Sequence, residues 1–422
     1  MRTVKLTIGW TLAVLVVLAL GLGTLAIVGL NVPVPSATLT ATADQQVADT
    51  ASFTLPSTGA AAVAYPSIDS DSGDYTVVAE QSSDSQRSIA SIAKVITALV
   101  VLDEKPIDDI TSSPSVAMTQ TDVQFYNSYS EQGGSVELVL EGYSFTEYEL
   151  LELALIPSAN NYAASLANWA FGSVTEFLNA ASTWLDAHGL DSTVITDPAG
   201  LDSGTVSTAS DLITLGQLAM DNDVIAGIVS QKYADVANIG TITTTNLALG
   251  SNGVVGIKTG TTYVAGYCLL FAVTSEDGSR TAIGAVIGMQ SRDDLYAAVD
   301  TLSAEMQAAF HTVDVVTEGE VAATLTTEWG DNADLVFSEA ISLPTVGATT
   351  VSFDVSHPEV TSLITDSTDG TATITVTDQT GSTQQTVTLT ATDGITTAPI
   401  SWQLQHALRW LPDDVLPFVG WR

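Results

Sequence analysis

One short stretch, Ser88–Leu99, constrains this chain more than any other. Apolar residues fill almost every position from Ile92 onward, which predicts a helix buried on all sides. Ser91 and Lys94 interrupt that surface three residues apart, so on a helix they lie on one face, one turn apart. A buried lysine is costly unless it is paired or neutral, and a lysine of lowered pKa can activate a neighbouring hydroxyl. A serine and a lysine at this spacing, taken by themselves, are also typical of a helix-capping serine beside a lysine that reaches solvent.

Lysine is rare in this chain, so the place of each one matters. The five are Lys5, Lys94, Lys105, Lys232 and Lys258. The formal net charge is −37, from 48 acidic and 11 basic residues. This argues against nucleic acid as a partner, because no basic patch is available to neutralise phosphates. It also disfavours purely electrostatic binding to anionic lipid.

Cysteine and histidine give no sign of a metal or a cofactor. The single Cys268 excludes an internal disulfide and a zinc site with several cysteine ligands. The histidines are scattered and lack the spacing of a helical metal motif. They are His188, His311, His357 and His406. We therefore expect no metal site and no cofactor.

The N-terminal segment predicts export. Arg2 and Lys5 precede an uncharged, mostly apolar run over residues 6–30, which is long enough to span a bilayer. The positive-inside rule leaves these two charges in the cytoplasm and the rest outside. We expect residues 1–30 to be a transmembrane signal anchor, with a signal peptide cleaved near Ala41–Ala43 as the alternative. Residues 31–58 are rich in Pro, Ala, Thr and Ser and predict a flexible linker.

The rest of the chain predicts an α+β domain followed by strands. Over residues 59–311, a hairpin, a series of helical patterns, a second hairpin and a final helix predict an antiparallel sheet with helices packed on it. Residues 312–398 contain short alternating runs separated by turn residues and predict a small all-β domain, a spacer or docking module. Residues 399–422 predict an amphipathic segment that either docks on its own domain or lies on a membrane.

Two further polar clusters accompany the first pair. Ser158-Ala159-Asn160 follows a helix that stops at Pro157, and Lys258-Thr259-Gly260 lies in a strand-like run. A serine with S-x-x-K spacing, an S-x-N cluster and a K-T-G cluster, in this order, form the signature of penicillin-binding proteins and class A β-lactamases. The chain resembles the low-molecular-mass penicillin-binding proteins, and specifically the D-alanyl-D-alanine carboxypeptidases. The resemblance extends over residues 58–400, including the loop Asp197–Asp202.

The resemblance implies a β-lactamase/transpeptidase-like domain and a set of roles. Ser91 would be the acylated nucleophile, Lys94 its base, Ser158 a proton relay, and Asn160 a hydrogen-bonding partner of Lys94 and of the substrate amide. The substrate-binding strand would supply Lys258, Thr259, Gly260 and Thr261. Within it, Thr259 would bind the terminal carboxylate, and the N–H of Thr261 would form the oxyanion hole with that of Ser91.

The implied enzyme is a serine-type D-Ala-D-Ala carboxypeptidase acting on peptidoglycan stem peptides, held at a bacterial membrane and inhibited by β-lactams. Arg292 would add to carboxylate binding, although a plain surface ion pair is the favoured interpretation there. One alternative is a class A-like β-lactamase, but Glu176 follows Asn160 too closely and lies in a helical pattern. The others are a non-catalytic cell-wall peptide-binding surface protein and a Ser-His-Asp hydrolase, which no histidine supports.

Overall fold

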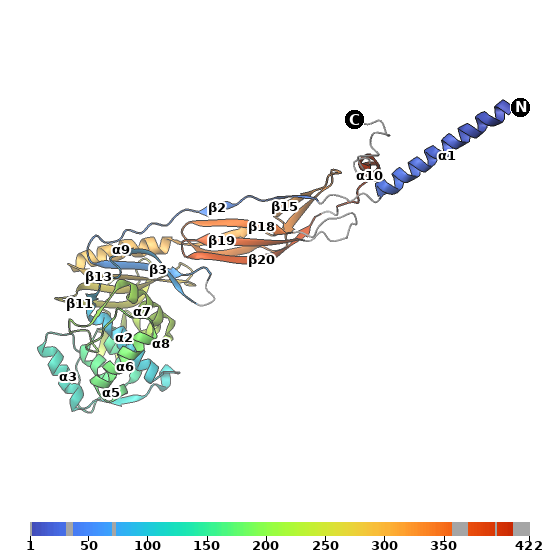
Figure 1. The fold of residues 1–422 in the computed structure, drawn as a ribbon. Coiled ribbons are helices and arrows are strands. Elements are labelled where there is room, and N and C mark those ends of the chain that lie inside the picture. The colour runs from blue at the N-terminus through green and yellow to red at the C-terminus, as the bar shows by residue number, and fades with distance from the viewer. Residues whose placement is uncertain (1, 31–36, 70–72, 357–369, 393–394, 408–422) are drawn as a thin grey trace.

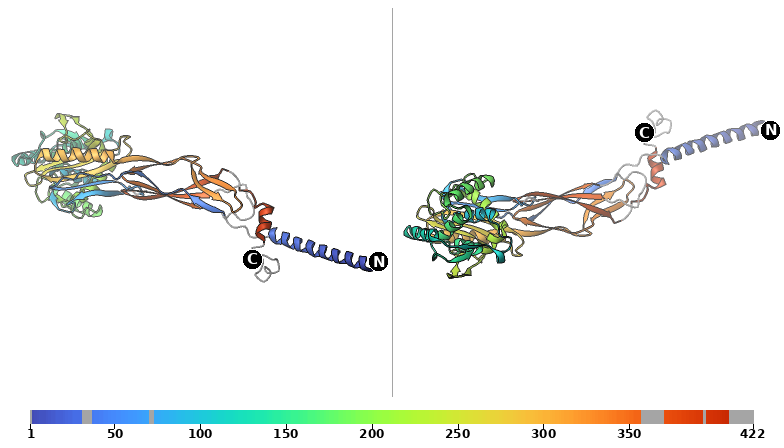
Figure 2. Two further views of the ribbon diagram at one scale, coloured as in Figure 1. Left: turned by 90° about the horizontal axis from the view of Figure 1, so that it is seen from above. Right: turned by 90° about the horizontal axis from the view of Figure 1, so that it is seen from below.

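The computed structural model describes residues 2–30, 37–69, 73–356, 370–392 and 395–407. The molecule is elongated, with a helix-rich part at one end joined to a narrower part built from strands (Figure 1). Helix α1 (Arg2–Leu30) and helix α10 (Ile400–Ala407) lie together beyond the far end of the strand-built part (Figure 2). The strand-built part thus separates the helix-rich part from both terminal helices.

A five-stranded antiparallel sheet in the order β11-β12-β13-β3-β4 forms the centre of the helix-rich part. Its strands are β3 (Ala60–Pro66), β4 (Tyr75–Gln81), β11 (Val254–Thr262), β12 (Gly266–Thr274) and β13 (Thr281–Met289). The apolar run of β3 is continuous because both of its faces are covered. Ala62 packs in one hydrophobic core and its neighbour Val63 in a second one across the sheet.

Helices cover both faces of this sheet. Helix α9 (Arg292–Ala308) packs Leu295, Val299 and Met306 into the core that contains Val63. The remaining helices form the larger core on the opposite face. They are α2 (Ala93–Glu104), α3 (Gln120–Glu131), α4 (Glu147–Leu155), α5 (Asn160–Phe171), α6 (Val174–Ala187), α7 (Ala209–Asp221) and α8 (Asp223–Val229).

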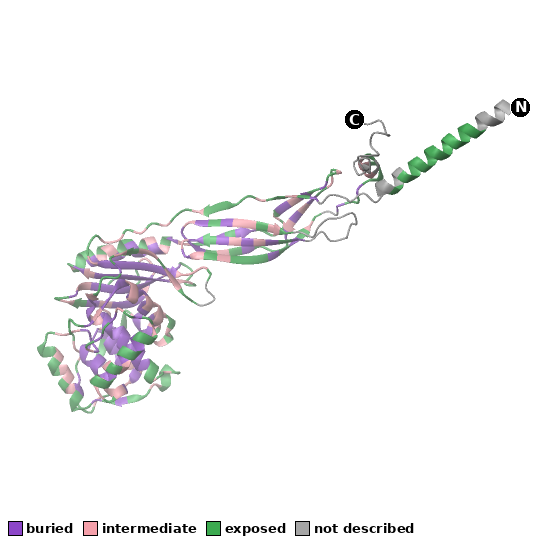
Figure 3. Cartoon of the chain, viewed as in Figure 1, coloured by how far each residue is buried: buried purple, intermediate pink, exposed green. Residues whose placement is uncertain are grey.

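Helix α2 is buried along nearly its whole length, as its apolar pattern predicts. Every residue from Ala93 to Leu102 is buried, and Lys94 is 0% exposed. Figure 3 shows buried residues concentrated in the sheet and inner helices of the helix-rich part, whereas α1 is exposed over its described residues. The alternative of a lysine that reaches solvent is therefore wrong for Lys94.

Short elements complete the helix-rich part. Two single turns, η1 (Ala90–Ile92) and η2 (Ile110–Ser112), precede α2 and β6 respectively. Three two-stranded ladders pair β5 with β8, β6 with β7 and β9 with β10. Their bounds are β5 (Arg87–Ser88), β6 (Ser115–Ala117), β7 (Ser144–Thr146), β8 (Val206–Ser207), β9 (Tyr233–Val236) and β10 (Gly240–Thr243).

The strand-built part is a seven-stranded antiparallel sheet, in the order β1-β15-β16-β20-β19-β18-β2, and a two-stranded ladder of β14 and β17. Inward residues such as Leu335 and Ile374 alternate with polar outward ones and share one hydrophobic core. The strands are β1 (Thr38–Ala41), β2 (Gln45–Ala48), β14 (Phe310–Val316), β15 (Val321–Thr326), β16 (Asn332–Phe337), β17 (Ile341–Val346), β18 (Thr349–Ser356), β19 (Gly370–Asp378) and β20 (Gly381–Ala391).

The predicted fold class, a helix-covered antiparallel sheet followed by an all-β region, is confirmed. The flexible linker expected over residues 31–58 is wrong for residues 38–41 and 45–48, because β1 pairs with β15 and β2 with β18. These edge strands are four residues long and pair with strands that are distant in sequence, so no local sequence pattern predicts them. Residues 31–36 lie outside the described residues.

The terminal segments are described only in part. Of the segment 399–422, the structure describes up to residue 407, and α10 is helical as expected. Within the described residues, no single helix is long and apolar enough to cross a membrane. The bent pair of α7 and α8 passes that test of length and composition when taken together, and Gly9–Thr24 forms a shorter apolar helix.

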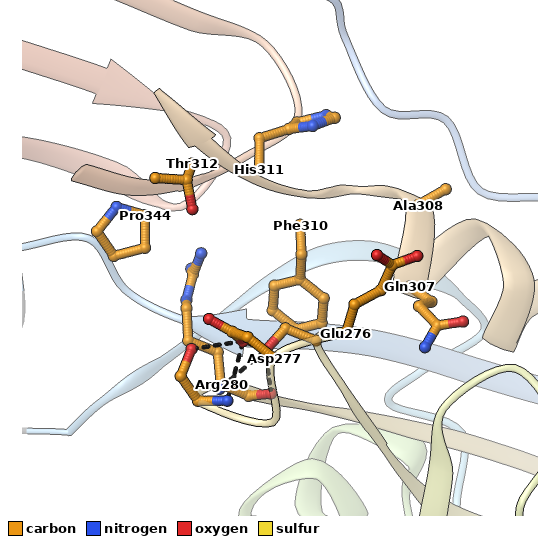
Figure 4. Close-up of a pocket in the computed structure, with 11 residues that line it drawn as sticks. Glu276, Asp277, Arg280, Gln307, Ala308, Phe310, His311, Thr312 and Pro344 are labelled. Atoms are coloured by element: carbon orange, nitrogen blue, oxygen red, sulfur yellow. Dashed lines mark hydrogen bonds between the residues drawn. The ribbon is translucent and has the colours of Figure 1, made fainter. Parts of the chain in front are cut away.

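A polar junction joins the two parts of the molecule. The Arg280 Nη1 atom donates a hydrogen bond to the Thr345 carbonyl of β17 at 3.0 Å, and its guanidinium lies 5.1 Å from the centre of the Phe310 ring. A cavity of about 390 Å³ opens beside this contact, with Glu276 and His311 on its walls (Figure 4). Arg280 therefore fastens the turn between β12 and β13 to the strands that follow α9.

Candidate active site

Ser91 and Lys94 meet at the start of α2. Ser91 lies in η1 and Lys94 in the first turn of the helix, so both side chains project from the same end. The Lys94 Nζ atom lies 2.7 Å from the Ser91 Oγ atom. The sequence predicted this pairing from helical spacing, and the structure places the two atoms at hydrogen-bond distance.

Lys94 has two further hydrogen-bond partners, and together they determine the direction in which its lone pair points. Its Nζ atom lies 2.7 Å from the Asn160 Oδ1 atom and 3.0 Å from the Ala199 carbonyl oxygen. Both of these oxygens only accept hydrogen bonds. A neutral amine that donates to both has one remaining direction, occupied by its lone pair, and that direction faces Ser91. The Ser91 hydroxyl then donates to Lys94, which is the arrangement a base needs to take its proton.

Burial and charge lower the pKa of Lys94. Desolvation lowers its pKa well below the usual value, the positive charge of Lys258 lowers it further, and the carboxylate of Asp197 raises it. Burial also lowers the pKa of Lys258, to about 7. Two lysines in one buried site repel each other, so the protonated form of Lys94 is disfavoured. Burial and the charge of Lys258 thus shift Lys94 toward the neutral form that a base requires.

Asp197 shapes the loop that reaches Lys94. Its Oδ1 atom accepts hydrogen bonds from the N–H groups of Ala199 at 2.9 Å, Leu201 at 3.2 Å and Gly200, and its Oδ2 atom accepts one from Asp202 at 2.7 Å. This folds the chain around one carboxylate and directs the Ala199 carbonyl at Lys94. The sequence predicted an irregular loop over Asp197–Asp202, but it did not indicate that the Asp197 carboxylate would accept these backbone hydrogen bonds.

Ser158 and Asn160 occupy the connection between α4 and α5. Ser158 adopts a left-handed backbone with φ of 68°, a conformation that costs a non-glycine residue energy and often marks a functional site. Its side chain is 6% exposed and lines a cavity beside Ser91. The backbone N–H of Asn160 donates to the Ser135 carbonyl at 2.7 Å, which fixes the start of α5. Asn160 therefore presents its amide to Lys94 from a fixed backbone.

Strand β11 forms the other side of the site. Thr259 and Thr261 line the cavity next to Ser91, whereas Lys258 is 1% exposed and donates to the Thr259 carbonyl at 3.1 Å. A Cβ atom on Gly260 would lie 2.4 Å from the Ile89 carbonyl oxygen, so only glycine allows β11 to lie this close to η1. The structure thus brings all eight predicted site residues to the junction of α2, α5 and β11.

Ser91 lies between two cavities. The first, which we call the Thr259 cavity, encloses about 350 Å³ and is lined by Ser158, Thr245, Thr259, Arg292 and Tyr296 among others. The second, the Tyr263 cavity, encloses about 580 Å³ and is lined by Gln132, Gly134, Leu201, Thr262, Tyr263 and Val264 among others. Ser91 and Thr261 line both, so a chain bound across the site passes the nucleophile with one end in each cavity.

The Thr259 cavity contains residues that the sequence did not single out. The Thr245 and Thr259 hydroxyls lie 2.6 Å apart, and the Tyr296 hydroxyl donates to the Thr245 carbonyl at 3.2 Å. Arg292 lies over the Tyr296 ring at 5.9 Å. The surface ion pair favoured for Arg292 is wrong: the one ion pair among the described residues joins Lys105 to Glu104.

Glu176, the residue considered for the β-lactamase alternative, lies away from Ser91. Glu176 is exposed at the start of α6, where its N–H binds the capping Ser173 hydroxyl, and it lines neither cavity beside Ser91. Among the described residues, no group of three or more His, Cys, Asp or Glu side chains could hold a metal ion. The chemistry that this arrangement supports is acyl transfer through Ser91, with Lys94 as the base.

A family model matches the part of the chain that contains this site. The model described as D-alanyl-D-alanine carboxypeptidase matches residues 50–291, which is more than half of the chain. The chain belongs to this family. The match covers every one of the eight predicted site residues, and it confirms the resemblance to the low-molecular-mass penicillin-binding proteins.

Individual relatives differ in how much of their length is matched. The chain is 31% identical over 198 residues to a D-alanyl-D-alanine endopeptidase of Escherichia coli, covering 44% of this chain but only 58% of that relative. It is 29% identical over 264 residues to a D-alanyl-D-alanine carboxypeptidase of a Streptomyces species, covering 57% of this chain and 88% of that one.

A solved structure resembles most of the fold. The crystal structure of a peptidoglycan synthesis regulatory factor from Streptococcus pneumoniae aligns with a TM-score of 0.57 at 20% identity. The alignment covers 81% of this chain and all of that one. The likeness therefore extends beyond residues 50–291 of the family match and shows a shared fold.

Proposed function

We propose that this protein is a serine-type D-Ala-D-Ala carboxypeptidase that removes the terminal D-alanine from peptidoglycan stem peptides. Family membership supports the reaction class. The observation that carries the proposal is the contact of Lys94 with Ser91, in which two acceptors leave the lysine lone pair facing the hydroxyl. Arg292 and Thr259 in the adjoining cavity supply a cation and a hydroxyl for a terminal carboxylate.

The reaction proceeds through an acyl-enzyme. The Ser91 Oγ atom attacks the carbonyl carbon of the penultimate D-alanine while its proton passes to Lys94. The backbone N–H groups of Ser91 and Thr261 stabilise the tetrahedral oxyanion. The C–N bond then breaks, and the leaving amine takes a proton through Ser158. Water then attacks the ester on Ser91 while Lys94 accepts a proton from it, and Lys94 returns that proton to the Ser91 Oγ atom as the ester C–O bond breaks, which restores the free enzyme. A β-lactam acylates Ser91 in the same way but leaves no separate amine product.

The surrounding segments have supporting roles in this proposal. Residues 1–30 anchor the protein in the bacterial membrane or direct its secretion, and residues 59–311 form the catalytic domain outside the cell. Residues 312–398, joined by β1 and β2, form a spacer that carries the catalytic domain away from the terminal helices. An elongated shape suits a substrate that lies in the cell wall at some distance from the membrane.

Release of D-alanine from a peptide that ends in D-Ala-D-Ala tests the proposal. The full chain is assayed with Ser91→Ala and Lys94→Met alongside. We expect release by the wild type and a loss of at least about a thousandfold in both variants, because nucleophile and base act as a unit. Absence of release by a folded wild-type protein overturns the proposal. In that case, rapid hydrolysis of a β-lactam would favour the β-lactamase alternative. Binding of the peptide with no hydrolysis of peptide or β-lactam would favour the non-catalytic peptide-binding protein.

A further inference from the structure

The Tyr263 cavity has an outer rim that the proposed reaction does not explain. Tyr263 and Val264 form the tip of the hairpin between β11 and β12, with relative exposures of 102% and 66%. The tip is fixed beneath them, because Ala265 is 4% exposed and its N–H donates to the Thr262 Oγ1 atom at 3.0 Å. A bare aromatic ring therefore projects from a firmly held turn at the edge of the site.

The direction of the substrate follows from the position of one cation. Arg292 lines the Thr259 cavity, which therefore suits the terminal carboxylate. The part of the peptide before the scissile bond must then lie on the other side of Ser91, in the Tyr263 cavity. That cavity, at about 580 Å³, has room for the side chain of the residue that precedes the two D-alanines.

No charged side chain lines the Tyr263 cavity, and the charged residues next in sequence to its lining are acidic. No lysine, arginine or histidine is among the residues that line it. Two lining residues, Gln132 and Leu201, are next in sequence to the exposed carboxylates of Glu131 and Asp202. A substrate carboxylate placed here would meet uncharged groups such as Ser135 and Ser203 but no cation. The negative charges of Glu131 and Asp202 would disfavour that carboxylate and would attract an ammonium.

We propose that the Tyr263 cavity selects stem peptides whose residue before D-Ala-D-Ala ends in a free ammonium, as lysine does, and rejects those in which that side chain also bears a carboxylate. This inference rests on the proposed function and names its substrate class. The aliphatic part of the side chain lies along Leu201 and Val264. The ammonium lies over the face of the Tyr263 ring, where the ring quadrupole attracts it.

Three acylated tripeptides ending in D-Ala-D-Ala test the selection. They carry at the first position a lysine with a free ε-amine, a lysine acetylated at that amine, or a diamino acid that keeps the amine and adds a carboxylate. The measurement is kcat/KM for D-alanine release by the full chain. We expect the free amine to exceed the acetylated form by about 3- to 30-fold and the carboxylated form to be the poorest substrate. Raised salt concentration narrows these differences.

Variants at the tip separate the ring from the rest of the cavity. Tyr263→Ala lowers kcat/KM for the free amine by about 3- to 30-fold and leaves the acetylated peptide nearly unchanged. Tyr263→Phe keeps the ring and restores the preference for the free amine over the acetylated amine. Val264→Ala lowers kcat/KM for both of these peptides by the same factor. Equal rates for all three peptides, or a preference for the carboxylated one, overturn the inference while leaving the carboxypeptidase intact. Absence of release from every peptide overturns the proposed function itself.

Discussion

At the scale of single residues, the neighbours of Lys94 decide what it can do. A lysine in solution is protonated at neutral pH, but this one is buried beside a second lysine, and both effects lower its pKa. Asn160 and Ala199 then fix the orientation of the amine. The one group that opposes this tendency is Asp197, whose carboxylate raises the pKa of Lys94. Asp197 therefore raises the pH at which Lys94 becomes neutral.

Asp197→Asn tests that coupling. The rate constant for acylation of Ser91 by a β-lactam rises with pH as Lys94 loses its proton, so it has an acid limb. Removal of the negative charge lowers the pKa of Lys94 further, and we expect the acid limb to move to lower pH. Asp202→Asn, in the same loop but bound to the Gly204 N–H, is the matched control and leaves the limb in place. A limb that stays or moves to higher pH in Asp197→Asn contradicts this role.

At the scale of elements, the site depends on how closely β11 approaches η1. Gly260→Ala places a Cβ atom 2.4 Å from the Ile89 carbonyl oxygen, and backbone must move on one side or the other. We expect a loss of about 1–3 kcal/mol in the free energy of unfolding and an acylation rate about a hundredfold lower, because Ser91 and Thr261 separate. Denaturant unfolding and β-lactam kinetics measure the two effects.

Gly227→Ala is the matched control for that change. Gly227 lies inside α8, and a Cβ atom there would meet nothing within 4 Å. The free energy of unfolding should rise by about 0.5–1 kcal/mol, since alanine favours a helix over glycine, with acylation unchanged. A Gly260→Ala protein that matched the wild type in both measurements would show that the close approach is unimportant.

Helix α4 contains a buried carboxylate that gives a prediction about pH. Glu147 is 0% exposed, neither carboxylate oxygen has a hydrogen-bond partner, and burial raises the pKa of its side chain to about 7. The folded state therefore holds this proton more tightly than the unfolded state does. The stabilisation is full below the unfolded pKa of about 4.3 and is lost as the pH rises through about 7.

Glu147→Gln removes that titration. Relative to the wild type, the variant should gain about 1–3 kcal/mol in free energy of unfolding between about pH 5 and pH 8. Glu149→Gln lies in the same turn, but its carboxylate is bound by the Thr146 N–H at 2.7 Å, so it serves as the control. Parallel pH profiles for Glu147→Gln and the wild type would refute the assignment.

At the scale of the whole molecule, the excess of negative charge acts against the fold. The formal net charge is −37, and the described residues contain a single ion pair, between Lys105 and Glu104. Salt therefore screens much repulsion and little attraction. We expect Tm to rise by about 2–4 °C between about 10 mM and 150 mM sodium chloride at neutral pH. At about pH 4, where many carboxylates are protonated, the rise should largely disappear. A Tm that falls with salt at neutral pH contradicts this picture.

The sequence revealed most about the residues whose surroundings are local. Ser91 in η1 and Lys94 in the first turn of α2 are three residues apart in one continuous stretch, so helical spacing predicted that they share a face. The three polar clusters gave the rest of the predicted site through their resemblance to a family. Features that depend on contacts between distant segments were missed, as with Thr245 beside Thr259 and Asp197 beneath Lys94. Strands β1 and β2 were missed for the same reason, since an edge strand of four residues takes its structure from its partner.

Acylation of Ser91 tests the central claim most directly. The full chain is incubated with a penicillin, and the site of the added mass is mapped by mass spectrometry after digestion, with Ser91→Ala and Lys94→Met in parallel. We predict an adduct on the peptide that contains Ser91, no adduct in Ser91→Ala, and acylation at least about a thousandfold slower in Lys94→Met. An adduct on another residue, or equal acylation without Lys94, would contradict the account.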